Sequence, residues 1–300
     1  MQSYLNGFRA YLHLERSLSP HTVEAYLNDV EKLTRYITEC YPNLRLSDLD
    51  LAHCEEFLGW LQQFGIAAST QARIISGIRT FFKYLCAENI LSRNPTELLD
   101  SPTIMRQIPD VLSVAEIDAL IAAIDHSRPD GMRSRAIIET LYACGLRVSE
   151  LVGLRLSGIY PDLGVLRIMG KGSKERLVPI HPEAMRHLQL YIDTTRQTYP
   201  IKKESIDIVF LNQRGGALSR ISVFNLIKQL ADIAAIGKNI SPHTFRHSLA
   251  THLYEGGADL RVVQEILGHE HITTTEIYTH VQPQYLRETL LLYHPLSRLQ

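Results

Sequence analysis

Several features that would place a protein in a class at once are missing from this chain of 300 residues. Only four cysteines are present, Cys40, Cys54, Cys86 and Cys144, and no pair has the close spacing of a zinc ribbon or a redox motif. We expect them to be small apolar residues in a reducing compartment. The N-terminus carries charges and no long apolar run, and no segment is typical of a transmembrane helix. A cytoplasmic protein without membrane contact is therefore expected.

An excess of positive charge is also missing. The formal net charge is −1; residues 1–110 hold 10 Lys and Arg against 13 Asp and Glu, and residues 111–300 hold 21 against 19. Any contact with nucleic acid would therefore come from charges at particular places rather than from a general basic field. No cluster of acidic residues suited to magnesium is evident in the sequence, and neither a metal nor another cofactor is expected.

What the chain does contain is apolar residues at helical spacing. Its length suggests two domains. Within residues 1–100 the periodicity predicts four helices, and the second has Ser19 as its N-cap and Pro20 at its first position. The predicted helices cover residues 3–16, 20–37, 48–64 (with a break near Leu51) and 69–86.

The fourth of these helices has a basic face. Its isoleucines, phenylalanines and Leu85 fill one arc, whereas Arg73, Arg79 and Lys83 lie largely outside that arc. Such a face could lie along DNA, and it could equally be a solvated helix face. The stretch alone does not separate these two interpretations.

Residues 101–112 hold two prolines and little periodicity, which predicts a linker between the domains. Ser113 with Glu116 three residues later has the pattern of a capping box, so a second domain, 113–300, is expected to begin there. Two strands joined by a tight turn over 170–174 predict a hairpin. The expected elements are helices at about 114–125, 131–144, 148–154, 183–191 and 221–236, and strands at 165–169 and 177–180. The predicted fold is mainly α with a small antiparallel β-sheet.

The stretch 241–280 concentrates unlike polar groups. Ser241 and Pro242 predict a helix start, with His243 in its first turn and Arg246 three residues later on the same face. Arginine fits phosphate with a fork of donors, and a helix N-terminus adds a positive dipole end. His269 follows the glycine that ends the next helix, and Tyr278 is the evident nucleophile of the stretch. The pattern predicts an anion site with a tyrosine beside it.

The runs HTFRH, LGH and IYTH, in this order and spacing, resemble the tyrosine recombinases, and closely the Xer group. The active site of that family also includes an upstream arginine and a lysine. The run ACGLRVSEL matches the arginine motif, with Glu150 beside the arginine, and GKGSKER matches the lysine motif of a β-hairpin. The six catalytic positions of the family are therefore filled by Arg147, Lys171, His243, Arg246, His269 and Tyr278.

The resemblance implies a mechanism. Tyr278 would attack a DNA phosphorus to leave a 3′-phosphotyrosyl link, with Lys171 as the acid for the departing 5′-oxygen. Arg147 and Arg246 would bind the non-bridging oxygens, His243 would assist proton transfer, and His269 would donate a hydrogen bond to phosphate. Glu150 would orient the basic side chains around it. No ATP would be needed, because the bond energy stays in the phosphotyrosine.

The resemblance also implies an architecture and partners. Residues 1–100 would be an N-terminal helical SAM-like core-binding domain that holds the duplex, and 113–300 the catalytic domain. Arg73, Arg79, Lys83, Lys174 and Arg176 are candidate DNA contacts. The expected partners are a double-stranded DNA recombination site, a second Xer-type recombinase in a cyclic heterotetramer, and a septal DNA translocase as activator. The expected role is the resolution of chromosome dimers at cell division. The amphipathic tail, 284–293, would dock on the next protomer, or it would pack on its own domain.

Other interpretations stay open at this stage. Within enzymes, they are an integrase of a phage or mobile element and a type IB topoisomerase; from another class, a catalytically silent DNA-binding protein. GKGS lacks the spacing of a phosphate-binding loop, and His243 with His247 lacks the glutamate of a zinc protease. Taken singly, Arg147 could merely pair with Glu150, and Lys171 could be a solvated turn residue. The joint occurrence of six positions in family order favours the recombinase.

Overall fold

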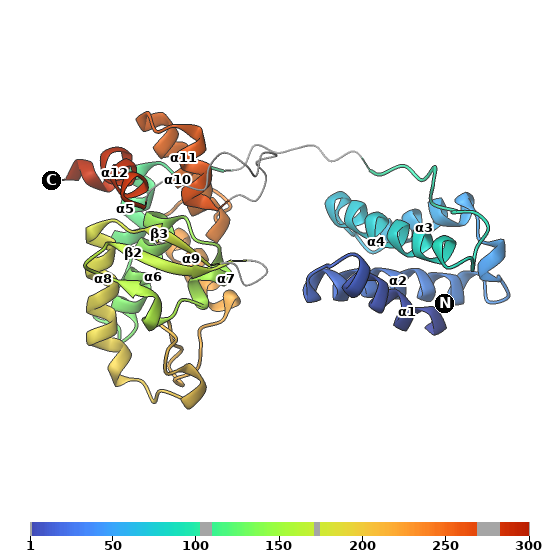
Figure 1. Ribbon diagram of the computed structural model, residues 1–300, viewed down its shortest axis with the longest axis horizontal. Coiled ribbons are helices and arrows are strands. Elements are labelled where there is room, and N and C mark those ends of the chain that lie inside the picture. Colours follow the sequence, from blue (N-terminus) through green and yellow to red (C-terminus); the bar gives the residue numbers. More distant parts are fainter. Residues whose placement is uncertain (1, 103–109, 171–174, 269–282, 300) are drawn as a thin grey trace. The chain divides into compact units, whose positions relative to one another are not determined.

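A computed structural model of the chain describes residues 2–102, 110–170, 175–268 and 283–299 (Figure 1). The chain divides into two compact units, Met1–Gln107 and Ile108–Gln300. Each unit has its own cluster of buried apolar side chains. The prediction of a mainly helical fold with one small antiparallel sheet is confirmed.

All the regular elements in the described part of the N-terminal unit are helical. Its helices are α1 (Leu5–Ala10), α2 (Pro20–Cys40), α3 (Leu51–Gln63) and α4 (Ala68–Ala87), with short 3-10 turns at Gln2–Tyr4 and Leu46–Asp48 and a π-helical turn at Tyr11–Glu15. The predicted cap of α2 is confirmed, because the Ser19 hydroxyl accepts the Thr22 N–H at 3.3 Å. The first predicted helix is divided, since the Arg16 N–H reaches back five residues to the Tyr11 carbonyl, wider than an α-turn.

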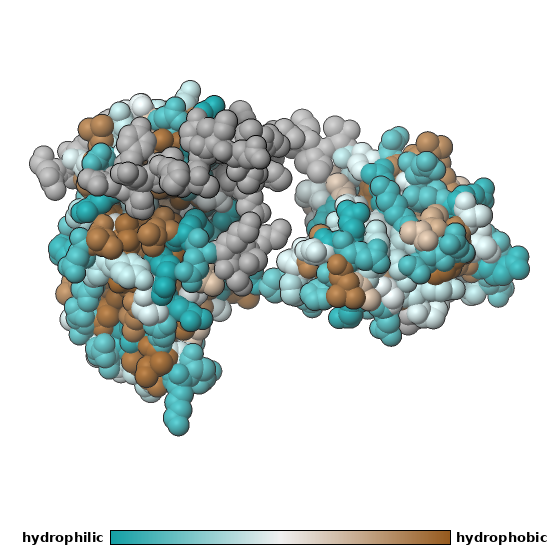
Figure 2. Space-filling model, in the orientation of Figure 1, coloured by the Kyte–Doolittle hydropathy of each residue, from teal (hydrophilic) through white to brown (hydrophobic). Residues whose placement is uncertain are grey.

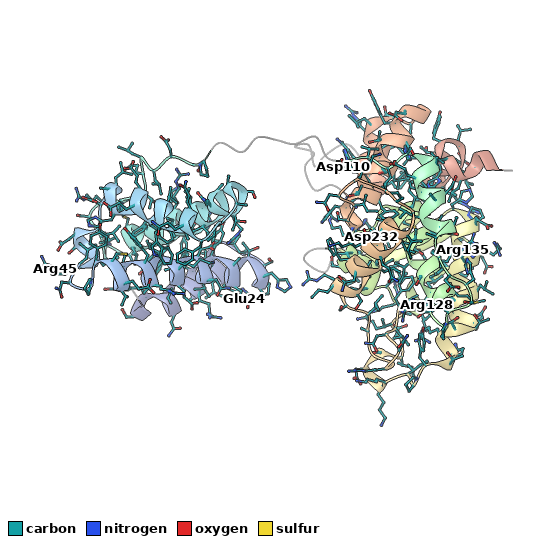
Figure 3. All side chains as sticks on the ribbon, turned by 180° about the vertical axis from the view of Figure 1, so that it is seen from behind. Glu24, Arg45, Asp110, Arg128, Arg135 and Asp232 are labelled. Carbon is teal, nitrogen blue, oxygen red and sulfur yellow. The ribbon has the colours of Figure 1, made fainter. Side chains whose placement is uncertain are left out.

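Aromatic rings fill much of the core of this unit. The ring of Phe8 meets that of Phe81 edge-on, with centroids 5.1 Å apart. Trp60, the single tryptophan of the chain, lies against Tyr36 and Phe64. Charged residues such as Glu24 and Arg45 point outward from the unit (Figure 3). Tryptophan fluorescence therefore reports on the folding of this unit alone.

One ion pair in this core joins α2 to α4. Asp29 is fully buried, and Arg73 donates to both of its oxygens, Nη1 to Oδ2 at 2.5 Å and Nη2 to Oδ1 at 2.8 Å. Lys32 adds a weaker contact at 3.4 Å. Gly77 makes room for the carboxylate, since a Cβ there would lie 2.7 Å from Oδ2. Arg73, a candidate DNA contact, thus holds two helices together.

Replacing Arg73 with methionine is expected to destabilise the N-terminal unit by about 3 kcal/mol, because it leaves a buried carboxylate with one weak partner. The value is at the lower end for a broken buried pair, since Arg73 is 42% exposed and Lys32 remains. Urea unfolding followed by Trp60 fluorescence measures the change. Arg35→Met removes an exposed pair with Glu39 and should change stability by less than about 1 kcal/mol. Equal small losses in both variants would contradict a structural role for Arg73.

The C-terminal unit combines helices with a small sheet. Its helices are α5 (Val114–Ala122), α6 (Gly131–Cys144), α7 (Val148–Val152), α8 (Pro182–Asp193), α9 (Arg220–Ile233), α10 (Pro242–Gly256), α11 (Leu260–Leu267) and α12 (Pro283–Tyr293), and its strands are β1 (Ile159–Tyr160), β2 (Val165–Met169) and β3 (Glu175–Pro179). The predicted capping box at the start of α5 is confirmed: the Glu116 N–H donates to Ser113 Oγ at 3.2 Å, and the Ser113 N–H donates to Glu116 Oε2 at 2.7 Å.

The sheet has the order β1-β2-β3, and all its pairs are antiparallel. The predicted hairpin corresponds to β2 and β3, with Met169 opposite Glu175. The sequence did not predict β1, because its two residues are too few to show alternation. Apolar side chains stay exposed on and beside the sheet, where Leu163, Met169 and Leu177 are each at least 42% exposed. Figure 2 shows apolar surface over the front of this unit, where Figure 1 places the sheet.

Helix α6 lies at the centre of this unit and contacts α8 and α10. All its residues from Ala136 to Cys144 are buried, including Glu139, which pairs with Arg135 one turn earlier. Helix α12 contacts β3, α10 and α11 of its own unit, with Leu290 fully buried. Of the two arrangements considered for this tail, the structure has the one in which it packs on its own domain.

The chain just after α12 rests on a buried histidine. His294 accepts the Leu296 N–H through Nδ1 at 3.1 Å, and its buried Nε2 has no hydrogen-bond partner among the described residues. Its ring stacks on His181 at 5.7 Å and meets Tyr142 edge-on at 4.8 Å. Burial, and then the charge of His181, lower the pKa of His294 to about 3; His252 acts in the same direction. Neutral His294 is therefore part of the packed state.

Lowering the pH from 7 to 5 is expected to weaken the C-terminal unit. The pKa of His294 is near 6.5 unfolded and about 3 folded, so the unfolded state takes up the proton first. The contribution of His294 to the free energy of unfolding is fully present above about pH 6.5 and decreases below it. At pH 5 this residue alone should lower the free energy of unfolding by about 2 kcal/mol. Urea unfolding monitored by circular dichroism measures the loss of stability between pH 7 and pH 5. This loss should be smaller in His294→Asn, whose side chain keeps an acceptor for the Leu296 N–H. Exposed His126→Asn is the control; an unchanged pH dependence in His294→Asn would contradict the assignment.

Candidate active site

Among the positively charged site residues in the described part of the chain, Arg246 is the most buried. It lies in the second turn of α10, which begins at Pro242 after the N-cap Ser241, as predicted. Its side chain is 8% exposed and donates to two carbonyls, Nη1 to Gly145 at 2.7 Å and Nη2 to Leu267 at 2.5 Å. Burial lowers its pKa to about 10, so the group stays protonated at neutral pH.

Both carbonyls stand at the ends of helices. Gly145 ends α6 and Gly268 ends α11, each in the left-handed conformation, with φ of 57° and 67°. The last carbonyls of a helix carry partial negative charge and lack partners within the helix, which favours a guanidinium there. At Gly145 a Cβ would also lie 2.6 Å from a methyl group of Leu267, so two helix ends meet at this point. The backbone alone therefore provides a seat for a buried cation.

Arg147 lies at the same place. It is the N-cap of α7, and its Nη2 donates to the Gly268 carbonyl at 3.2 Å. Because Leu267 and Gly268 are consecutive, their carbonyls bring the guanidinium groups of Arg246 and Arg147 close together. The side chain of Arg147 is 39% exposed, so it is open to a ligand from solvent. These two arginines belong to separate motifs, 99 residues apart in the sequence.

Glu150 is the acidic member of the cluster. It is 6% exposed, and it accepts Nη1 and the backbone N–H of Arg147, both at 2.9 Å. Arg176 on β3 donates to both of its oxygens, at 2.8 and 2.9 Å. Burial is the largest influence on Glu150 and opposes ionisation, but the hydrogen bonds from Arg176 and Arg147 outweigh it and lower its pKa. Glu150 is therefore an ionised carboxylate between two arginines.

The balance of charge makes this cluster an anion site. Three guanidinium groups face one carboxylate, so the group as a whole carries two positive charges in excess. The hydrogen bonds that the structure describes for Arg246 go to neutral carbonyls, which do not balance its positive charge. A phosphate that binds here would be neutralised without a metal, and two fixed guanidiniums suit the charge that develops on phosphoryl oxygens. Within the described residues, no group of three or more His, Cys, Asp and Glu is arranged to hold a metal ion.

The remaining predicted catalytic residues divide into two sets. His243 lies in the first turn of α10 and is exposed, although it is only three residues from buried Arg246. Lys171, His269 and Tyr278 lie outside the described residues, as does Lys174. In the sequence, Lys171 follows β2 by two residues, and His269 comes directly after Gly268, whose carbonyl binds Arg147.

The candidate DNA contacts on α4 have different surroundings. Arg73 holds Asp29, as described above. Arg79 donates to the Leu99 carbonyl and, at 3.4 Å, to the Ser101 hydroxyl, so it fastens the segment after the helix. Lys83 is exposed, and the structure gives it no partner among the residues it describes. Lys83 is thus the most available of the three for a phosphate.

The contact of Arg176 with Glu150 is a feature that sequence reasoning missed. Arg176 was expected only as a DNA contact. Its strand did carry a signal, because residues two apart in a strand point to the same side and Val178 is fully buried. An arginine on the inward side of a strand needs hydrogen-bond acceptors there, and the carboxylate of Glu150 supplies them.

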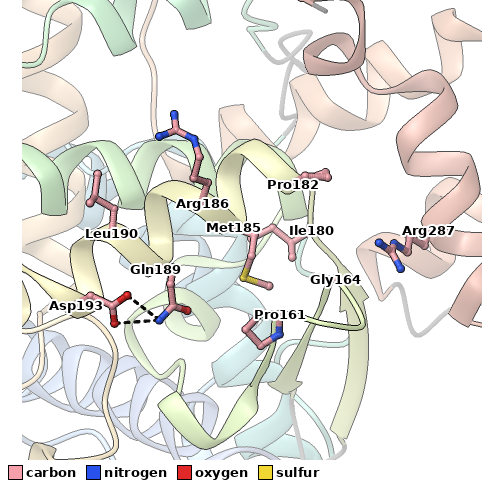
Figure 4. A pocket seen from close by; sticks show the side chains of 10 residues that line it. All are labelled: Pro161, Gly164, Ile180, Pro182, Met185, Arg186, Gln189, Leu190, Asp193 and Arg287. Atoms are coloured by element: carbon pink, nitrogen blue, oxygen red, sulfur yellow. Dashed lines mark hydrogen bonds between the residues drawn. The ribbon is translucent and has the colours of Figure 1, made fainter.

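A separate hollow lies between α8, the β1–β2 turn and α12 (Figure 4). It has a volume of about 510 Å³, and Pro161, Met185 and Leu190 form apolar parts of its wall. Gln189 donates to Asp193 at its edge, and Arg287 reaches it from α12. None of the predicted site residues lines this hollow.

None of the helices in the described ranges has the length and apolar character to cross a membrane.

Comparison with known proteins identifies the family of the chain. The phage integrase family matches residues 110–285, and the N-terminal SAM-like domain of phage integrases matches residues 5–89. The chain is 43% identical to the tyrosine recombinase XerD of Chlorobaculum tepidum, over 97% of this chain and 96% of that protein. It is 41% identical to the tyrosine recombinase XerD of Staphylococcus aureus, over 98% and 99%. A crystal structure of the XerH site-specific recombinase bound to a difH substrate, a pre-cleavage complex, is similar with a TM-score of 0.68 and 26% identity, over 89% of this chain and 78% of that one.

A mainly helical catalytic unit with an arginine cluster, preceded in the sequence by a SAM-like helical unit, defines an integrase-type DNA strand transferase. The chain belongs to the phage integrase family, and within it the chain is a XerD-like, site-specific tyrosine recombinase. The runs GGADLRVVQ and HITTTEIYTH predict the XerD branch, and the two relatives named XerD agree with that prediction.

Proposed function

We propose that the arginine cluster binds the phosphate at which the recombinase cuts DNA. Arg147 and Arg246 hold the two non-bridging oxygens and stabilise the charge that builds up on them in the transition state. The observation that carries this proposal is that both guanidiniums bind successive carbonyls at the end of α11, while Arg147 remains partly open to solvent. Glu150 keeps Arg147 in place.

The chemical step follows from the motif positions. The Tyr278 oxygen forms a bond to phosphorus as the bond from phosphorus to the 5′-oxygen breaks, which leaves a 3′-phosphotyrosyl link and a 5′-hydroxyl. His243 assists removal of the tyrosine proton, Lys171 gives a proton to the departing oxygen, and His269 donates a hydrogen bond to phosphate. The reverse reaction with another strand's 5′-hydroxyl rejoins DNA, so neither ATP nor a metal is consumed.

The biological role proposed is the resolution of chromosome dimers at cell division, in the cytoplasm. The near full-length similarity to proteins named XerD supports it. Residues 1–100 would bind the core of a double-stranded recombination site, 101–112 would link the domains, and 113–300 would carry out catalysis. On α4, Lys83 would contribute a DNA contact more readily than Arg79 and Arg73, which have partners within their unit. Lys174 is a further proposed contact, from its place in the lysine motif. The similar XerH recombinase was solved with its difH substrate, which supports a DNA site of the same kind.

The proposed assembly is a cyclic heterotetramer with a second Xer-type recombinase, with a septal DNA translocase as activator. In such a ring, α12 would leave its own unit for the next protomer. Deleting residues 284–300 would test for lost synapsis, but it also removes Leu290 from the core. A variant that alters only exposed Leu292 is therefore the better probe of synapsis.

Covalent trapping tests the proposed active site. The full-length protein is incubated with a nicked suicide duplex that carries candidate dimer-resolution sites, and the complex is resolved on a denaturing gel. Digestion and mass spectrometry are expected to find a nucleotide adduct on Tyr278. Binding without any adduct, even with a partner recombinase and a translocase domain present, would favour a silent DNA-binding protein. Relaxation of supercoiled DNA without synapsis would favour a topoisomerase, and cutting only at an element's attachment site would favour an integrase.

A further inference from the structure

Arg176 occupies a junction between three parts of the catalytic unit. It belongs to β3, its guanidinium binds Glu150 of α7, and it lies against Gly268 at the end of α11. A Cβ at position 268 would come within 2.7 Å of its Nε, so the glycine is needed for this approach. The same Gly268 offers its carbonyl to Arg147. Arg176 therefore reaches Arg147, the proposed phosphate ligand, only through Glu150 and Gly268.

The geometry at Glu150 joins the two arginines. Arg176 donates Nη1 to Oε1 and Nη2 to Oε2, at 2.8 and 2.9 Å, which fixes the plane of the carboxylate. Arg147 then binds the same two oxygens through Nη1 and its backbone N–H, both at 2.9 Å. A carboxylate with only one of these partners could turn about its last side-chain bond. With both, it has a single orientation, and so has the guanidinium of Arg147.

Arg176 has little left with which to bind DNA. Its side chain is 21% exposed, and both terminal nitrogens are engaged with Glu150. Its Nε is buried without a hydrogen-bond partner in the described part of the chain. A direct phosphate contact would require it to give up a buried, two-point ion pair, which is costly.

We propose that Arg176 is a positioning residue of the recombination reaction. It fixes Glu150, which fixes Arg147, and it anchors strand β3, which follows Lys171 in the sequence, to that carboxylate. Lys171 precedes Arg176 by five residues in the sequence, so one side chain ties the hairpin that carries the proposed acid to the proposed phosphate site. The inference rests on the roles proposed above for Arg147 and Lys171. It changes Arg176 from a DNA contact to a residue that acts through others.

Loss of Arg176 has a second consequence, which gives a distinctive measurement. Glu150 faces Arg147 on its own helix, Arg176 from β3 and the charge of Arg246 from α10. Burial acts to raise the pKa of Glu150, and the hydrogen bonds of Arg176 are the largest influence against it. Without Arg176, Glu150 should take up a proton more readily and release Arg147. Cleavage by the variant should then rise with pH, whereas the wild type has no such dependence on this group near neutrality.

The experiment measures single-turnover cleavage of the suicide duplex at saturating DNA, together with DNA affinity in a binding assay. Arg176→Met, which removes charge and donors but keeps a long side chain, is expected to slow cleavage about 100-fold, as for a small misplacement of catalytic groups. Its Kd should stay within about twofold, and cleavage should partly recover as the pH is raised. Arg176→Lys should show a smaller loss. The matched control is Arg167→Lys on β2, an arginine of the same hairpin that donates to the Ser157 carbonyl at 3.1 Å.

A double-mutant cycle separates positioning from general structure. Glu150→Gln alone should lose about as much as Arg176→Met, and adding Arg176→Lys to it should cost little more, because the two residues act as one unit. Should the methionine variant not fold, the lysine variant and this cycle give the answer.

Three results would overturn the inference. The first is normal cleavage at saturating DNA with weakened binding, which would return Arg176 to the DNA contacts. The second is additive losses in the cycle. The third is a loss in Arg167→Lys equal to that in Arg176→Lys. A wild-type protein that binds DNA but never forms a covalent complex would instead remove the proposed active site itself, and the positioning role with it.

Discussion

Replacing Tyr278 with phenylalanine is expected to abolish the covalent protein–DNA complex, with a loss of cleavage of at least about 10⁴-fold, as for removal of a nucleophile. The substitution removes one hydroxyl and keeps the ring, so DNA affinity should stay within about twofold. The reason is chemical: the hydroxyl oxygen is the atom that joins phosphorus, and the arginine cluster can stabilise the transition state only when a nucleophile is present.

The measurement is trapping on the suicide duplex with an electrophoretic binding assay in parallel. Tyr254→Phe is the matched control, because Tyr254 belongs to α10 of the same unit and is 61% exposed. It should cleave like the wild type. A covalent complex that persists in Tyr278→Phe would move the nucleophile to another residue. Loss of binding together with cleavage would make Tyr278 a structural or DNA-contacting residue.

Replacing Arg246 with lysine is expected to slow single-turnover cleavage about 10²- to 10³-fold, the range for losing one preorganised donor group at a developing charge. A guanidinium can hold the carbonyls of Gly145 and Leu267 and still present N–H groups to phosphate. An ammonium group has three donors at one point and cannot span these positions. Because the pKa of Arg246 is about 10, the wild-type group stays charged across neutral pH.

The control for this variant is another buried arginine of the same unit. Arg196 is 3% exposed and donates to the carbonyls of Ile206 and Ile208, at 2.8 and 3.0 Å, away from the arginine cluster's residues. Arg196→Lys should cost about as much stability as Arg246→Lys, since each leaves buried carbonyls poorly satisfied, at about 1–3 kcal/mol each. It should cleave at the wild-type rate at saturating DNA. Equal cleavage losses in the two variants would mean that Arg246 acts only through stability.

The predictions for Arg246 and Arg176 concern two different roles in one site. Arg246 is expected to touch the reacting phosphate, and Arg176 is expected to act through Glu150 and Arg147. A variant of Arg246 should therefore lose cleavage at every pH, whereas Arg176→Met should recover part of it as the pH rises. Comparing the two pH profiles separates a direct contact from a positioning contact in a single set of experiments.

Much of the fold was predictable because its signals are local. The caps Ser19, Ser113 and Ser241 act within three residues, and the helices that follow them begin where the sequence predicts. The glycines after α10 and α11 end those helices in the left-handed conformation, as their positions indicate. The short strand β1 was missed, since two residues show no period, and the π-turn at 11–15 interrupts a segment whose apolar spacing is that of a plain helix.

The order of the motifs determined the family and the candidate catalytic residues, because that chemistry needs particular residue types at particular positions along the chain. What surrounds those residues came only from the tertiary structure. Arg176 meets Glu150 across 26 residues, Arg73 meets Asp29 across 44, and Arg246 meets the Gly145 carbonyl across 101. Such contacts depend on which faces of distant elements pack together, and no rule of local spacing carries that information. For this reason the sequence could name Arg176 only as a positive charge near DNA, whereas the packed structure makes it the partner of a buried carboxylate.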